Sequence, residues 1–75
     1  MLKHIEELKD MLEREEYNIR RLTTLNALIE CRFINVDLTY LLRALHTGDE
    51  EDIENNRQIL KRTIEKVIEG RYGCR

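Results

Sequence analysis

Apolar residues recur at steps of three and four through most of the chain, which is the spacing that places side chains on one face of an α-helix. The polar residues Glu15 and Asn26 fill two places in this stripe, and no Gly or Pro lies before Gly48. The apolar members of the stripe are Ile5, Leu8, Leu12, Ile19, Leu22, Ile29, Phe33, Val36 and Tyr40. The pattern predicts one helix over residues 2–45, of the kind that forms a left-handed coiled coil.

A second set of apolar residues begins beside the first stripe at residue 27. Its members are Ala27, Cys31, Ile34, Leu38, Leu42 and Leu45. A helix that is apolar over most of its circumference is packed on several sides. A single short helix downstream cannot cover so much surface, so the pattern predicts a homo-oligomer. The residues predicted to form its interface are Leu22, Asn26, Ile29, Phe33, Ile34, Leu38, Leu41, Leu42 and Leu45.

The clearest stop signal in the sequence is the stretch from residue 46 to residue 49. Gly48 readily adopts the positive φ that ends a helix. Thr47 followed by Glu50 fits a capping box, and Asp49 is an alternative N-cap for the next helix. We therefore expect one all-α domain over residues 1–75. It consists of a long helix, a turn at 46–49, a shorter antiparallel helix over 50–69 and a tail at 70–75, and this helical hairpin assembles into an oligomeric helix bundle.

A different fold follows if the long segment breaks. Asp37 is a candidate N-cap of a new helix near residues 35–37, whereas a turn at residues 23–26 would give three helices of similar length and a self-contained three-helix bundle. Neither place contains a strong helix breaker. Asn26 is open to two interpretations as well: it fixes the register of a helix–helix contact, or it lies at the edge of that contact and faces solvent.

The composition is that of a helical protein, with 37% charged residues, no Pro and a net charge of −2. A chain of 75 residues is marginally stable when it folds alone, and oligomerisation is a usual aid. Residues 1–16 and 47–57 are net acidic, whereas 17–46 and 58–75 are net basic. Alternating blocks suit chains that pack antiparallel or staggered, and they argue against a generally basic nucleic-acid binder.

Four arginines, Arg14, Arg21, Arg32 and Arg43, are separated by 7, 11 and 11 residues. On one continuous helix they would share a face opposite the apolar stripe. Guanidinium groups recognise phosphates and carboxylates, so the row is a candidate contact for an acidic protein, a nucleic-acid backbone or a small anion. The alternative is a solvated face with local ion pairs.

The remaining chemistry-bearing residues predict neither catalysis nor a cofactor. Cys31 and Cys74 lack a disulfide-rich spacing, which favours a reduced, cytoplasmic chain with Cys74 as an exposed thiol. Together with His4 and His46 they do not form a metal-ligand spacing. No apolar run approaches the roughly 20 residues that span a bilayer, so no membrane partner is expected.

The sequence therefore favours a non-enzymatic protein-interaction module that acts as a homo-oligomer. A small regulator or inhibitor that binds a larger macromolecule, most readily another protein, is compatible with it. Two alternatives stay open: a nucleic-acid-binding regulator that uses the arginine row, and an oligomer that holds a small anionic ligand between chains.

Overall fold

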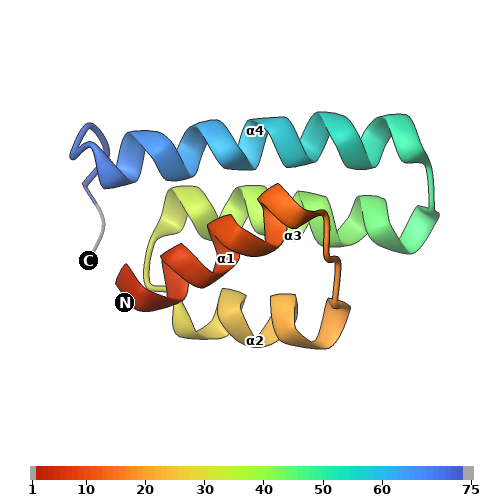
Figure 1. The fold of residues 1–75 in the computed structure, drawn as a ribbon, viewed down its shortest axis with the longest axis horizontal. Coiled ribbons are helices and arrows are strands. Elements are labelled where there is room, and N and C mark those ends of the chain that lie inside the picture. The colour runs from red at the N-terminus through yellow and green to blue at the C-terminus, as the bar shows by residue number, and fades with distance from the viewer. Residues whose placement is uncertain (1, 74–75) are drawn as a thin grey trace.

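Residues 2–73 form four α-helices, each of which runs antiparallel to the one before it (Figure 1). The computed structural model describes residues 2–73. The helices are α1 (Leu2–Arg14), α2 (Ile19–Leu28), α3 (Arg32–Thr47) and α4 (Glu50–Ile68). In this part of the chain α1 and α3 each pack against both α2 and α4, which closes a four-helix arrangement around one core. The expectation of an all-α protein is confirmed, whereas the helical hairpin is replaced by four helices.

The core receives apolar side chains from all four helices and from the connection before α3. Burial of such side chains is the main force that holds helices together, at about 1.5–3 kcal/mol for each large residue. The fully or almost fully buried residues are Ile5, Leu8, Met11, Leu12, Leu22, Leu25, Ile29, Cys31, Ile34, Leu38, Leu41, Ala44, Leu60 and Ile64. The predicted three-helix alternative is also wrong, because residues 23–26 lie within α2 and residues 35–37 lie within α3.

The first break in the predicted long helix lies at residues 15–18. There Glu15 adopts a φ of 55°, in the left-handed region. Its N–H donates to the carbonyl of Leu12, and the N–H of Glu16 donates to the carbonyl of Met11, at 3.2 and 3.0 Å. These two bonds form a Schellman motif, which satisfies carbonyls that the end of α1 leaves unpaired. Asn18 then caps α2 by accepting the N–H of Arg21.

Replacing Glu15 by Gly is expected to stabilise the fold by roughly 0.5–1 kcal/mol. An L-residue in the left-handed region costs about 1–2 kcal/mol, and Gly avoids this cost while losing somewhat more backbone entropy. The control is Gly70→Ala, because Gly70 occupies the same place after α4 with a φ of 81° and has open space around it. We expect this change to destabilise the fold. Urea denaturation of both variants measures the effects, and a shift of the same sign in both would contradict the motif.

The second break lies at residues 29–31 and is held by the side chain of Asn35. Its Nδ2 atom donates to the backbone carbonyls of Asn26 and Ile29, at 2.8 and 2.9 Å, and also lies 2.8 Å from Oδ1 of Asn26. The carbonyl of Asn26 is one of those that the end of α2 leaves without a helical partner. Asn26 in turn donates to Thr39 at 3.2 Å. In this chain Asn26 therefore belongs to a network that joins α2 to α3.

The turn between α3 and α4 lies within the predicted stretch. Gly48 ends α3 with a φ of 76°, and the carboxylate of Asp49 accepts the N–H groups of Glu51 and Asp52 at 3.0 and 3.3 Å. The hydroxyl of Thr47 donates to the carbonyl of Ala44, so the capping box is not formed. Asp49, the alternative, is the N-cap of α4.

Cys31 is buried and disulfide-bonded, so the expectation of a reduced thiol is wrong for this residue. Disulfides persist mainly in oxidising compartments, which weakens the reason for expecting a cytoplasmic protein. The prediction of an exposed thiol at Cys74 lies outside the described residues.

Candidate functional site

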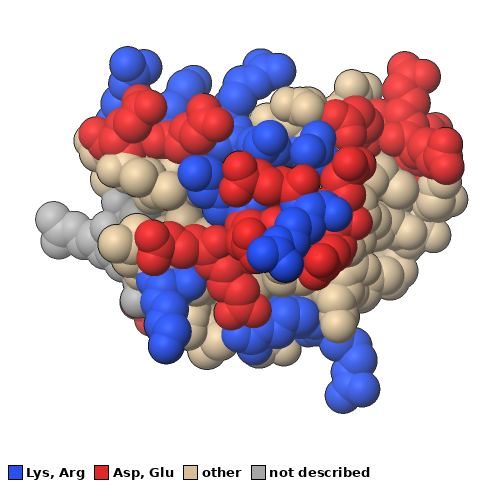
Figure 2. Space-filling model, viewed as in Figure 1, with Lys and Arg blue, Asp and Glu red and all other residues tan. Residues whose placement is uncertain are grey.

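The outward side of α3 carries three large exposed side chains in helical register. Phe33, Val36 and Tyr40 are 46%, 47% and 54% exposed, and they lie on a different side of the helix from the buried Ile34, Leu38 and Leu41. Ile59 on α4 is 48% exposed. By contrast, the face of the molecule shown in Figure 2 is covered largely by interleaved basic and acidic side chains. Single exposed apolar residues are common, but neighbouring ones often mark an interaction site.

Two hollows follow one another along the line where α3 and α4 meet. The first has a volume of about 350 Å³ and is lined by Arg32, Phe33, Val36, Asp37, Ile59, Thr63 and Tyr72. The second has a volume of about 310 Å³ and is lined by Tyr40, Arg43, Ala44, Thr47, Asp52 and Asn56. We call the two together the α3/α4 groove. Its lining combines apolar, aromatic and charged side chains.

Side-chain contacts hold the walls of the α3/α4 groove in place. The hydroxyl of Thr63 donates a hydrogen bond to the carboxylate of Asp37, which ties α4 to α3 at the floor. The ring of Tyr72 stacks on Phe33 with 4.5 Å between centroids. The ammonium of Lys66 lies 5.6 Å from the centroid of the Tyr72 ring. The last two contacts hold the Tyr72 ring against Phe33 and Lys66 at one end of the groove.

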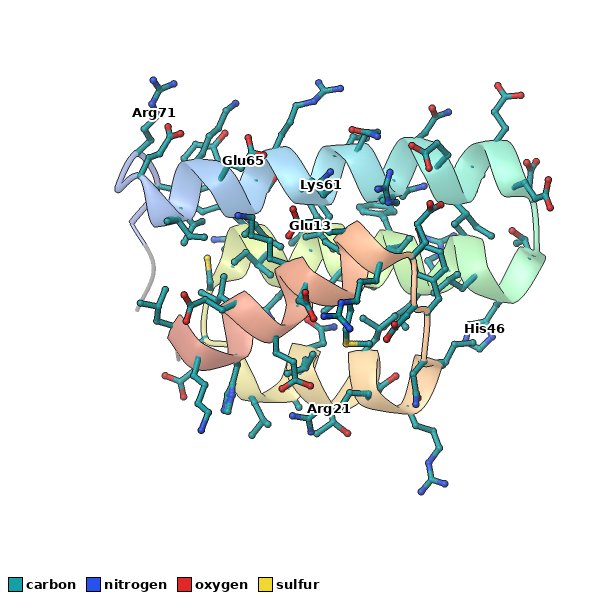
Figure 3. The ribbon with its side chains drawn as sticks, viewed as in Figure 1. Glu13, Arg21, His46, Lys61, Glu65 and Arg71 are labelled. Carbon is teal, nitrogen blue, oxygen red and sulfur yellow. The ribbon has the colours of Figure 1, made fainter. Side chains whose placement is uncertain are left out.

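The four arginines of the predicted row lie on three different helices, because the long helix does not form. Arg14 pairs with Asp10 on α1 at 3.2 Å. Arg21 projects from α2 (Figure 3) and holds Glu7 of α1 through two bonds of 2.6 Å, and this hydrogen bonding lowers the pKa of Glu7. Arg32 and Arg43 line the α3/α4 groove, and Arg43 lies 5.9 Å from the ring of Tyr40. Anion binding by these side chains stays a prediction.

Most residues of the predicted oligomer interface lie in the chain's own core. The fully or nearly buried ones are Leu22, Ile29, Ile34, Leu38 and Leu41, whereas Asn26, Leu42 and Leu45 are half-buried. Phe33, the remaining residue of the predicted interface, is exposed. The sequence interpretation omitted Val36, Tyr40, Ile59 and Tyr72 from the interface. The signal is present in the sequence, since Phe33, Val36 and Tyr40 share one face, but their spacing continues the apolar stripe of the predicted coiled coil.

A third hollow, of about 420 Å³, lies beside the connection between α1 and α2. Its lining is acidic and consists of Glu15, Tyr17, Glu50, Ile53 and Glu54. The hydroxyl of Tyr17 is buried there without a hydrogen-bond partner among residues 2–73. Burial raises the pKa of Tyr17. A buried hydroxyl that makes no hydrogen bond destabilises the folded state.

Tyr17→Phe is expected to raise the stability of the fold by about 1 kcal/mol. The change keeps the ring and removes a hydroxyl whose desolvation costs about 1–3 kcal/mol without compensation. Tyr40→Phe is the control, because the Tyr40 side chain is exposed and its hydroxyl has access to water. Thermal unfolding followed by circular dichroism measures both. A loss of stability in the Tyr17 variant would show that the hydroxyl has a partner in solution.

Residues 2–73 give no support to metal binding or to a membrane-spanning helix. No group of three or more His, Cys, Asp or Glu side chains within residues 2–73 is placed to hold a metal ion. None of the helices α1 to α4 combines the length and the apolar character needed to cross a membrane. The chain matches no protein-family model, no curated protein and no solved structure.

Proposed function

We propose that this chain is a small helical protein-interaction module and that the α3/α4 groove is the surface with which it binds a protein partner. The observation that carries the proposal is the row of exposed apolar side chains beside the groove, formed by Phe33, Val36, Tyr40 and Ile59. The cost of exposing such residues to water is recovered when a partner covers them. Their register on two neighbouring helices gives a partner helix a continuous surface to pack against.

The composition of the groove supports a protein partner. Three of the four aromatic residues of the chain, Phe33, Tyr40 and Tyr72, lie beside or within it. Two arginines, Arg32 and Arg43, line it as well. Aromatic and arginine side chains are enriched at the centres of protein interfaces and contribute a large share of the binding energy.

A nucleic-acid partner receives less support from the same residues. Arg14 and Arg21 are paired with acidic side chains, and the four arginines do not share one face. A net charge of −2 also opposes long-range attraction to a nucleic acid. The same dispersal of the arginines counts against a shared site for a small anion.

The proposal is tested by affinity capture with three forms of the chain as bait. Val36→Asp places a charge within the exposed row, and Leu28→Asp places the same charge on α2, where Leu28 has a similar exposure of 46%. We expect the wild type and the Leu28 variant to retain the same protein from lysate of the producing cells, and the Val36 variant to lose it. Equal capture by all three forms would show that the α3/α4 groove is not the binding surface.

A further inference from the structure

The sides of the α3/α4 groove carry two stripes with the spacing of helix–helix contacts. The stripe on α4 consists of Asp52, Asn56, Ile59, Thr63 and Lys66, at steps of 4, 3, 4 and 3 residues. The stripe on α3 consists of Phe33, Val36, Tyr40, Arg43 and Thr47, at steps of 3, 4, 3 and 4. Alternating steps of three and four place side chains along one line between paired helices. Both stripes fit a partner that is itself a pair of helices.

The α4 stripe is complementary to the same stripe on a second α4 that runs antiparallel to it. Asp52 lies seven residues before Ile59, and Lys66 lies seven residues after it. When a second α4 lies antiparallel with the two Ile59 side chains opposite each other, Asp52 of each copy faces Lys66 of the other. The same rotation places Asn56, three residues before Ile59, within one residue of the level of Thr63, which lies four residues after it. Apolar contact is therefore made at the centre and charge pairing at both ends.

We propose that the occupant of the α3/α4 groove is a second copy of this chain, related by a two-fold axis that crosses the helices beside Ile59. This inference rests on the proposed function and names the partner. A two-fold axis makes the interface isologous, so that each contact occurs twice. The surface is the α3/α4 groove and not the set of core residues that the sequence had indicated.

The α3 stripe agrees with the position of this axis. The hydrogen bond between Thr63 and Asp37 sets the level of antiparallel α4 relative to α3, and it places Ile59 near the level of Tyr40. The axis therefore passes close to both residues. The axis brings Tyr40 of one copy towards Tyr40 of the other. It also brings Arg43 towards Asp37 of the second copy, since Asp37 lies three residues before Tyr40 and Arg43 lies three residues after it.

The charges at the two ends of the bundle select the antiparallel arrangement. The end at the turn between α3 and α4 carries Asp49, Glu50, Glu51 and Asp52, whereas residues 58–73 are net basic. His46 and Arg71 mark these opposite ends in Figure 3. A parallel arrangement would place acidic on acidic and basic on basic ends, and like charges close together disfavour association. The antiparallel arrangement pairs opposite charges at both ends.

Sedimentation equilibrium with the intact chain tests the self-association. We expect the wild type to pass from the 9.1 kDa monomer to a dimer as its concentration rises to about 1 mM. Ile59→Asp would place two carboxylates against each other at the axis, and we expect it to weaken the dimer at least tenfold. Leu28→Asp, on α2, is expected to leave the dimer unchanged. Circular dichroism checks that both variants keep the helical content of the wild type.

A charge exchange distinguishes a second copy from any other occupant. Asp52→Lys and Lys66→Asp each create like charges across the axis twice per dimer, and each is expected to weaken it about tenfold. The double variant exchanges the two charges within one chain, so we expect it to dimerise nearly as well as the wild type. A binding site for a different protein would not recover its affinity in this way.

Two results would overturn the inference. One is a wild type that stays monomeric over the whole concentration range. The other is a dimer that Ile59→Asp does not weaken or that the charge exchange does not restore. Neither decides the proposed function, because capture of another protein that is lost in the Val36→Asp bait would still establish the α3/α4 groove as a binding surface.

Discussion

Leu38→Asp is expected to unfold the chain, whereas Val36→Asp, two residues away on the same helix, is expected to leave it folded. The Leu38 side chain is fully buried at the centre of the core, and Val36 is 47% exposed. A buried carboxylate without a partner costs more than 4 kcal/mol or forces the site open. A domain of 75 residues has only about 4–11 kcal/mol of stability in total. Circular dichroism and the dispersion of amide resonances measure the outcome.

This pair of variants separates the observed fold from the oligomer that the sequence predicted. In a coiled-coil oligomer, Leu38→Asp would dissociate the chains and leave a helical monomer. In the four-helix fold it removes the fold itself. A cooperative thermal transition close to that of the wild type in the Leu38 variant would contradict the central position of α3.

Asn35→Ala is expected to destabilise the fold by about 2–3 kcal/mol, the second of the large effects. The change removes the donor that satisfies the carbonyls of Asn26 and Ile29 at the break between α2 and α3. Each hydrogen bond contributes about 1 kcal/mol, and an unsatisfied buried group adds a penalty of similar size. Urea denaturation measures the free energy of unfolding, and its slope shows whether the compactness of the denatured state has changed.

Asn55→Ala is the control for Asn35→Ala, because Asn55 is exposed on α4. Its replacement by Ala, the best helix former, is expected to change stability by less than about 0.5 kcal/mol. Equal effects from the two variants would mean that the Asn35 network contributes nothing to the break. A larger helical content in Asn35→Ala would instead indicate that α2 and α3 fuse into one helix when the network is removed.

The last helix could be predicted from the sequence because its signals are local. Gly48 supplies the positive φ, Asp49 supplies the cap and Gly70 ends the helix. Each of these residues acts through its own backbone or its nearest neighbours, so no tertiary information is needed. The expected helix over residues 50–69 and the observed α4 accordingly differ by one residue.

The first break could not be predicted, because the residue in the left-handed conformation is Glu15. Such a conformation is usual for Gly and uncommon for Glu. Burial of α1 against α2 and α4 offsets its local cost. Arg57 of α4 adds to this offset by donating a hydrogen bond to the carbonyl of Leu12 at 2.8 Å, at the negative end of the α1 dipole.

The second break was hidden by the phase of the apolar stripe. Phe33, Val36 and Tyr40 continue the spacing of Leu22 and Ile29, and they suggested an unbroken helix. In the structure these three lie at the surface, and the other apolar set, which includes Ile34 and Leu38, enters the core. In the sequence this break appears as a step of five residues from Ile29 to Ile34, where a continuous helical stripe advances by three or four.

The α3/α4 groove exists because, of the two apolar sets on α3, one enters the core and the other lies at the surface. Only when Ile34 and Leu38 occupy the core does the other side of α3, with Phe33 and Tyr40, face outwards. The other side of the groove is formed by α4, which packs against α3 and donates a hydrogen bond from Thr63 to Asp37, 26 residues away in the sequence. Periodicity alone does not indicate which of two apolar faces is inside, because that depends on the positions of the other helices.

Amide chemical shifts recorded over a dilution series test most directly the claim that the α3/α4 groove receives a second copy. Concentration-dependent shifts are expected to gather at Val36, Tyr40 and Ile59, and the amide of Leu28 on α2 is expected to stay unchanged. Shifts centred on α2, or spectra that do not change between about 10 µM and 1 mM, would contradict the account.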